Sequence, residues 1–320
     1  MLAALSRIDI MIRMLALAVL LASIVPATGD ARPIAQTISN IGIFLLFFLN
    51  GVRLSRAEIV KGMGNARFLI AITVWCYGMM SLAGLALYWL GAHVLPPLVA
   101  LGMLFLGTLP STVQSAAAYT SMARGNVASS VVTAALLNIL GVFIAAPIFT
   151  WLSGGAFVEL GLDGLTKLFL ILILPFALGQ LLQNRLSGWL ATRKSLIGWM
   201  DRTAISIAVY VAFSGAVEQD FWGKLDIAGW GWVMALLCAL LVFAYAGSWA
   251  LSGLLRLDYA ERISFMFAGA HKSVATGAPP ALVMFSPEIA GLILVPLLIY
   301  HLLQLVVSAP IANRLAARQE

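Results

Sequence analysis

Long apolar runs separated by short polar stretches fill almost the whole chain. A helix that crosses a bilayer needs about 20 consecutive apolar residues. Ten runs of about this length follow one another, at 8–27, 34–53, 67–92, 95–123, 127–152, 164–186, 202–218, 228–252, 258–286 and 288–312. The pattern predicts an all-α polytopic membrane protein with ten transmembrane helices.

The composition agrees with this class. Of the 320 residues, 62% are hydrophobic and 10% are charged, and the mean hydropathy is +1.00. Soluble domains do not have this balance. The net charge of +6 therefore does not indicate a nucleic-acid partner, because excess Lys and Arg in membrane proteins marks cytoplasmic loops. Cys76 and Cys238 both lie in apolar runs, so no disulfide framework or metal site is predicted.

The basic residues orient the chain. With the N-terminus inside the cell, 15 of the 19 basic residues lie in inside segments: Arg7, Arg13, Arg53, Arg56, Lys61, Arg67, Arg124, Arg185, Arg193, Lys194, Arg202, Arg256, Arg262, Arg314 and Arg318. The outside loops carry Arg32, Lys167 and Lys224, and Lys272 lies within a run. We expect a multi-pass protein of the cell membrane (inner or plasma) with both termini cytoplasmic.

The chain shows an internal repeat at an offset of 163 residues. LNILGVFIAAPI from Leu137 matches YHLLQLVVSAPI from Tyr300. The same offset pairs runs 1 to 4 with runs 6 to 9, which predicts five-helix repeats at 1–157 and 158–320. Five helices per half give the halves opposite orientations, the inverted-repeat plan of secondary transporters. The first run resembles a signal peptide, but the pairing predicts that it is retained.

Runs 4 and 9 are interrupted by polar and helix-breaking residues. GTLPSTVQS at 107–115 interrupts the first, and GAHKSVATGAPP at 269–280 interrupts the second. The offset places residues 109–115 on residues 272–278, so the two breaks are equivalent. Broken backbone at this depth must face protein or a water-filled cavity, and the half-helices that begin there favour an anion. The pattern predicts that helices 4 and 9 are both broken within the membrane.

Lys272 is the most informative single residue, because it lies some 14 residues from either end of run 9. A charged lysine at a helix centre costs roughly 2.5–3.5 kcal/mol, and no Asp or Glu lies inside any run to pair with it. Its partners are then backbone carbonyls, polar side chains or a bound anion. A snorkelling lysine is the alternative. A lysine that loses its proton would also couple transport to protons.

Other polar residues extend this candidate site. His271 is a proton carrier or substrate donor, or a neutral contact between helices. The repeat-related Asn138 and His301 either bind a ligand or join helices. The predicted substrate site comprises Lys272, His271, Ser273, Thr276, Ser111, Thr112, Gln114, Asn138, His301 and Gln304. Gln114, Ser115 and Ser130 are candidate ligands for a small cation; the hydroxyls at the breaks could equally cap half-helices.

Enzyme motifs are missing from the sequence. It contains no Walker motif, no HExxH, no GxGD-type aspartate and no Gly-x-Ser-x-Gly elbow. Catalysis would have to rest on Lys272, His271 or His301 alone. We therefore expect a protein that is not an enzyme and that needs no cofactor.

The motifs together resemble one family. AYTSMARGNVASSV at 118–131, LPSTVQS before it, and later GAHKSVATG with LVPLLIYHLLQLVV are similar to the bile acid:sodium symporter family, in its SBF-like branch. The resemblance spans nearly the whole chain. It implies broken, crossing helices 4 and 9 and an organic anion as substrate.

The sequence departs from the sodium sites that the resemblance implies. Where sodium-coupled members carry Ser-Asn, Ser, Thr, Glu, Gln and Asn, this chain has Ala116, Ala117, Ser130, Ala134, Phe267, His271 and Lys272. Of these positions, only Ser130 has the same residue type as in the sodium-coupled members. Our hypothesis is that the Lys272 ammonium stands where a sodium ion would hold the crossover. Transport would then be independent of sodium or coupled to H⁺ through Lys272 or His271; Na⁺ coupling through Gln114 and Ser115 is the alternative.

We expect a secondary active transporter of a small organic anion, working by alternating access around the crossover in a lipid bilayer. The alternative is a non-transporting membrane regulator or scaffold built on a transporter fold. Substitution of Lys272 by alanine separates them, because a scaffold would tolerate it. An intramembrane enzyme is a weaker alternative. The substrate, the coupling ion and the oligomeric state do not follow from the sequence.

Overall fold

The computed structural model describes residues 10–53, 65–155, 166 and 169–318, and all regular structure in these ranges is helical. Seven of its helices are long and apolar enough to cross a membrane, and the bent pair α7 (Pro97–Thr108) and α8 (Val113–Met122) makes an eighth. The predicted multi-pass helical protein is confirmed at this level; the count of ten stays a prediction. Arg7, Arg56, Lys61, Lys167 and the predicted 157/158 boundary lie outside the described residues.

Two of the ten expected spans are not among these eight. The first is represented by α2 (Ile10–Ile24), whose 15 residues extend about 22 Å, less than the ~30 Å hydrocarbon core. The ninth is represented by two short helices, α15 (Tyr259–Ala270) and α16 (Val274–Met284). The remaining expected spans coincide with helices of the structure.

The chain divides into two compact units. Unit 1 comprises Met1–Ser55, Phe157–Lys224 and Ala278–Leu294, and unit 2 comprises Arg56–Ala156, Leu225–Gly277 and Val295–Glu320. Each unit draws on both halves of the sequence. The borders between them fall inside α16 and α17 (Pro287–Ala317) as well as in the connections between helices.

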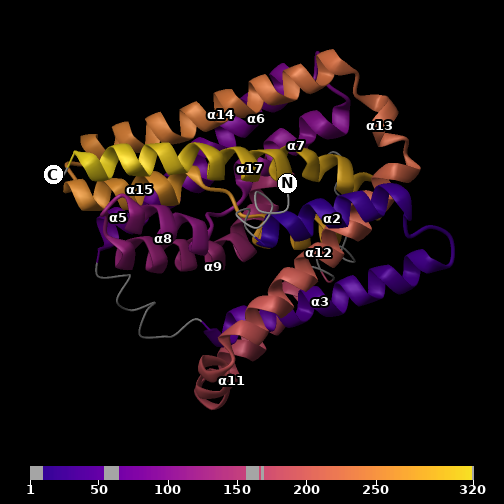
Figure 1. Ribbon diagram of the computed structural model, residues 1–320, viewed down its shortest axis with the longest axis horizontal. Coiled ribbons are helices and arrows are strands. Elements are labelled where there is room, and N and C mark those ends of the chain that lie inside the picture. Colours follow the sequence, from indigo (N-terminus) through magenta and orange to yellow (C-terminus); the bar gives the residue numbers. More distant parts are fainter. Residues whose placement is uncertain (1–9, 54–64, 156–165, 167–168, 319–320) are drawn as a thin grey trace, which may run out of the picture. The chain divides into compact units, whose positions relative to one another are not determined.

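Unit 1 is built around α3 (Ala31–Arg53). The helices α11 (Leu174–Thr192, preceded by the turn η2, Phe169–Ile173) and α12 (Lys194–Glu218) pack against α3, and α12 also packs against α2 (Figure 1). The core there includes Leu49 and Val52 of α3 with Leu190 and Ile197. Such packing leaves many large apolar side chains of the outer faces exposed, as lipid contact requires.

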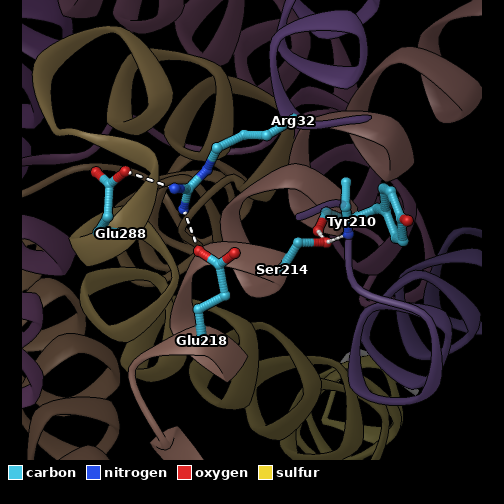
Figure 2. Close-up of polar contacts among 6 residues, drawn as sticks. Arg32, Tyr210, Ser214, Glu218 and Glu288 are labelled. Carbon is cyan, nitrogen blue, oxygen red and sulfur yellow. Dashed lines mark hydrogen bonds and ion pairs between the residues drawn. The ribbon is translucent and has the colours of Figure 1, made fainter. Parts of the chain in front are cut away.

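Ion pairs fix the relative direction of α3 and α12. Arg32, in the first turn of α3, pairs with Glu218 at the end of α12 (2.8 Å) and with Glu288 of α17 (2.9 Å), as Figure 2 shows. At the other end of α3, Arg53 pairs with Asp201 near the start of α12 (2.7 Å). The two helices therefore run antiparallel.

Unit 2 contains both helix breaks. The span formed by α5 (Ala66–Thr73), η1 (Val74–Met79) and α6 (Met80–Gly91) packs against α7, and α15 packs against α8, α9 (Val127–Leu152) and α14 (Ile227–Leu254) (Figure 1). The short α13 (Phe221–Lys224) precedes α14. Asparagine and aspartate side chains cap the starts of α5, α9, α14 and α15, which satisfies first-turn amides that a helix leaves unpaired.

Both interruptions predicted from the sequence lie in this unit, but they are shorter than predicted. The first leaves residues 109–112 outside helices, and the second leaves residues 271–273. The helix resumes at Val274, and Pro279 and Pro280 lie inside α16. Prolines remove backbone donors without forcing an end to the helix, and membrane helices tolerate this where neighbours satisfy the freed carbonyls.

Candidate functional site

The two breaks meet at residues that the 163-residue offset pairs. The main-chain N–H of Ser273 donates to the carbonyl oxygen of Pro110 (3.3 Å), and Lys272 Nζ donates to the carbonyl oxygen of Leu109 (2.6 Å). Residue 109 corresponds to 272, and residue 110 to 273. The two helix breaks are thus in direct contact.

The Lys272 side chain is completely buried (0% exposed), yet its ammonium group is surrounded by oxygen. Besides Leu109, Nζ donates to the carbonyl oxygens of Gly107 (3.0 Å) and Cys76 (3.4 Å). An ammonium group has three donors, and here each has a main-chain acceptor. Hydrogen bonds from a charged donor are the stronger kind, so they offset the cost of burying the charge.

The Cys76 carbonyl reaches Lys272 because of a π-helical turn. At the end of η1 the N–H of Met80 bonds the carbonyl of Trp75, five residues back, instead of the carbonyl of Cys76, four residues back. This shift removes the usual α-helical partner of Cys76 and turns its oxygen toward the crossover. Such π turns are frequent at functional sites.

Gln304 of α17 holds the main chain of Lys272 from both sides. Its Oε1 accepts from the Lys272 N–H (2.7 Å), and its Nε2 donates to the Lys272 carbonyl (2.9 Å). Nε2 also contacts His301 Nδ1 (2.8 Å). The free carbonyls at the end of α15 are bonded as well, Gly269 by Trp75 Nε1 (3.2 Å) and Ala270 by the Tyr300 hydroxyl (2.8 Å). The second break is therefore held by side chains of two other segments, η1 and α17.

His271 lies in a hydrogen-bond network of hydroxyl groups. Its Nδ1 contacts Ser115 Oγ (2.9 Å), and its Nε2 contacts Ser308 Oγ (2.8 Å) and the Tyr245 hydroxyl (3.1 Å). Ser308 donates its only hydrogen to the Gln304 carbonyl, so its oxygen accepts from Nε2–H. Nδ1 then accepts from Ser115, and the neutral Nε2–H imidazole satisfies its partners.

Three predicted site residues carry buried polar atoms without a hydrogen-bond partner among the described residues: Ser111 Oγ, Thr276 Oγ1 and Asn138 Oδ1. Ser111 is completely buried. Gly141, one turn after Asn138, packs on Pro110, which precedes Ser111; Gly277, which follows Thr276, packs on Leu109. All three orphan atoms therefore lie close to the first break.

The remaining predicted residues differ in their contacts. Thr112 contacts Ser115 and His271, and Ser273 Oγ accepts from the Thr276 N–H (3.2 Å) as the cap of α16. Gln114 is exposed, and Ser130 accepts from Thr120 (3.3 Å). Among the described residues no contact joins Gln114, Ser115 and Ser130, the candidate cation ligands.

Sequence reasoning missed Tyr245, Ser308 and the Cys76 carbonyl. One signal was present for Ser308, because His301, Gln304 and Ser308 are spaced i, i+3 and i+7 and share one helix face. Tyr245 had no such signal, and a carbonyl displaced by a π turn leaves no trace in the side-chain pattern.

Comparison with known proteins identifies the family. The profile of the SBF-like CPA transporter family matches residues 9–317. The chain belongs to this family. It is 37% identical to "Uncharacterized protein PA2026" of Pseudomonas aeruginosa, over 94% of this chain and 91% of that protein. It is 35% identical to "Putative symporter YfeH" of Escherichia coli K12, over 94% and 91%.

More distant relatives carry names that state an activity. The chain is 24% identical to "Sodium/bile acid cotransporter 7" of Mus musculus, over 88% of this chain and 83% of that protein. The resemblance to an SBF-like transporter family is thus confirmed. The matched family is a family of transporters, and together with the long apolar helices it makes this chain a multi-pass membrane protein.

The sodium sites that the wider family resemblance implies do not fit this SBF-like chain. Three of the positions hold apolar side chains that are fully buried, Ala116, Ala134 and Phe267 (each 0% exposed). The position of Lys272 brings a positive charge. Within the described residues there is also no group of three or more His, Cys, Asp or Glu side chains that could hold a metal ion.

Proposed function

We propose that this protein is a secondary active transporter that moves a small organic anion across the cell membrane by alternating access around the crossover of α7/α8 and α15/α16. The observation that carries the proposal is the contact between the two helix breaks, Ser273 to Pro110 and Lys272 to Leu109. Each contact joins residues 163 apart, the offset of the repeat. A pseudo-twofold axis through the crossover of inverted repeats would bring equivalent residues together in this way.

The directions and bounds of other helices support the same plan. By the offset of 163, α3 corresponds to α12, and the ion pairs at both ends make these two helices antiparallel. The bounds of α9 and α17, and of the span from α5 to α6 and α14, also agree with the offset to within a few residues. Inverted five-helix repeats require this agreement.

The chemistry at the breaks favours an anion. The half-helices α8 and α16 both begin there, and the start of α8 has no side-chain cap. Helix N-termini present unpaired N–H groups with partial positive charge. Ser111, Thr276 and Asn138 add polar atoms that have no hydrogen-bond partner within the described part of the chain, and buried polar groups of this kind commonly bind water, an ion or a ligand.

Binding and uptake measurements on Ser111 and Thr276 test the proposal. Small carboxylate and sulfonate anions are screened by thermal shift on purified protein and by uptake into proteoliposomes. Ser111→Ala and Thr276→Val should each weaken binding of an active anion about tenfold, the loss of roughly 1.4 kcal/mol expected for one hydrogen bond to a charged ligand. Their unfolding temperatures should stay near wild type, since neither hydroxyl bonds another group among the residues that the structure describes.

Ser248→Ala is the matched control. Ser248 is also completely buried in unit 2, but its hydroxyl donates to the Ala244 carbonyl of its own helix, so binding should not change. If both site variants take up the anion as fast as wild type, the assignment of the site is wrong. A protein that binds and moves none of the anions supports the scaffold alternative instead.

A further inference from the structure

We infer that Lys272 is a tethered cation: its ammonium group fills a monovalent-cation site made of the carbonyl oxygens of Cys76, Gly107 and Leu109. The crossover therefore closes without a metal ion. The contacts carry the inference by themselves; its consequence for transport, independence from sodium, rests on the proposed function.

The site has the chemistry of a cation site. Three main-chain carbonyl oxygens converge on one positive centre from the π turn η1, the end of α7 and the first break. Rings of carbonyl oxygens are what proteins use to replace the hydration shell of Na⁺ or K⁺. None of the three acceptors is a side chain, so the sequence alone does not display the site.

The same contacts argue against a direct role of Lys272 in holding a substrate anion. All three donors of Nζ are used, and the side chain has no exposed surface. Gln304 fixes the main-chain N–H and C=O of the same residue, so the lysine cannot turn without breaking five hydrogen bonds. The charge instead joins the two broken helices to each other and to η1.

This arrangement has a consequence that a merely structural lysine would not have. Removal of the side chain should open a carbonyl-lined space that accepts a small monovalent cation such as ammonium, methylammonium or sodium. Choline is too large for a space that the lysine side chain fills. The wild-type protein, in which the site is occupied, should be indifferent to the cation.

Thermal unfolding of the purified full-length chain tests these expectations. Wild type, Lys272→Ala and Lys224→Ala are compared in choline, sodium, ammonium and methylammonium chloride at equal ionic strength. Lys224 is an exposed lysine of α13 and serves as the control. In choline, Lys272→Ala should unfold about 5–10 °C below wild type, because three buried carbonyls lose their partner. At least half of this loss should be recovered, in a saturable manner, with ammonium or sodium.

Several results would overturn the inference. The first is an unfolding temperature of wild type that rises in sodium but not in the other salts. The second is an unfolding temperature of Lys272→Ala equal to that of wild type. The third is a fall in the unfolding temperature of Lys272→Ala that is the same in every salt. If Lys272→Ala yields no folded protein, Lys272→Gln replaces it. Its amide donates to at most two carbonyls, so the same cation response should appear with a smaller shift, and its absence contradicts the inference.

The stability readout requires no substrate. A cation response of Lys272→Ala therefore stands even if Ser111→Ala and Thr276→Val leave anion binding unchanged, which would contradict only the proposed function. Conversely, sodium-dependent uptake by wild type together with anion binding at Ser111 would support the transporter and overturn the tethered cation.

Discussion

At the scale of residues, the crossover is organised by main-chain groups that side chains satisfy. The sequence shows that Lys272 lies deep in an apolar run and has no acidic partner there, which leaves backbone carbonyls, polar side chains or a bound anion as its predicted partners. It does not show which carbonyls, because these depend on the π turn at Cys76 and on where α7 ends. Gln304 belongs to the predicted substrate site, but its two bonds to the Lys272 main chain follow only from the packing of α17.

Substitution of Gln304 by leucine tests the importance of this clamp. Gln304→Leu has nearly the same volume but leaves the buried N–H of Lys272 without its acceptor, at a cost of about 1–3 kcal/mol, and removes the 2.9 Å donor of the Lys272 carbonyl. We expect the unfolding temperature to fall by roughly 5–10 °C. Leu302→Ala, on the exposed side of the same helix (43% exposed), should change it little. Equal effects of the two substitutions would show that the clamp contributes nothing.

At the scale of elements, a close approach of two helices brings the carbonyl ligands of Lys272 together. Gly84 of α6 and Gly107 of α7 face each other, and a Cβ at Gly84 would lie 2.8 Å from the Met103 carbonyl oxygen and 3.0 Å from Gly107 Cα. The sequence predicts both apolar helices and the break after Thr108, since length and hydropathy determine these. It does not predict their contact, because apolar membrane helices carry no periodic polar face that marks a partner.

Gly84→Ala should separate these helices and so weaken the Lys272 site from outside it. The methyl group has only backbone atoms as neighbours, which cannot move away independently, and such overpacking costs about 1–3 kcal/mol. The unfolding temperature should fall by a few degrees in differential scanning fluorimetry. Gly231→Ala, in α14 with no atom within 4 Å of the new Cβ, should be neutral or slightly stabilising. The proposed contact is contradicted if Gly84→Ala unfolds at the same temperature as the control, Gly231→Ala.

At the scale of the whole molecule, the 163-residue offset and the directions of the helices both support the inverted-repeat plan. The offset of 163 came from a short match between two apolar segments, and the helices of the structure follow it in length and order. Two pairs of spans that the offset relates, α2 with α11 and α3 with α12, lie in the same compact unit, unit 1. The division into units did not follow from the sequence, because each unit combines segments far apart in the chain and no linker composition marks them.

Two equivalent positions provide a test of the inverted orientation of the repeats. Ala31 begins α3 and Lys194 begins α12, they are 163 residues apart, and both side chains are exposed. Inverted repeats place them on opposite sides of the membrane, with Ala31 outside and Lys194 inside as the basic loops require. In a Cys76→Ser, Cys238→Ser background, Ala31→Cys should react with a membrane-impermeant maleimide in intact cells, and Lys194→Cys only after permeabilisation. Labelling of both from the same side would contradict the inverted repeat, and labelling in the reverse order would keep the repeat and place both termini outside.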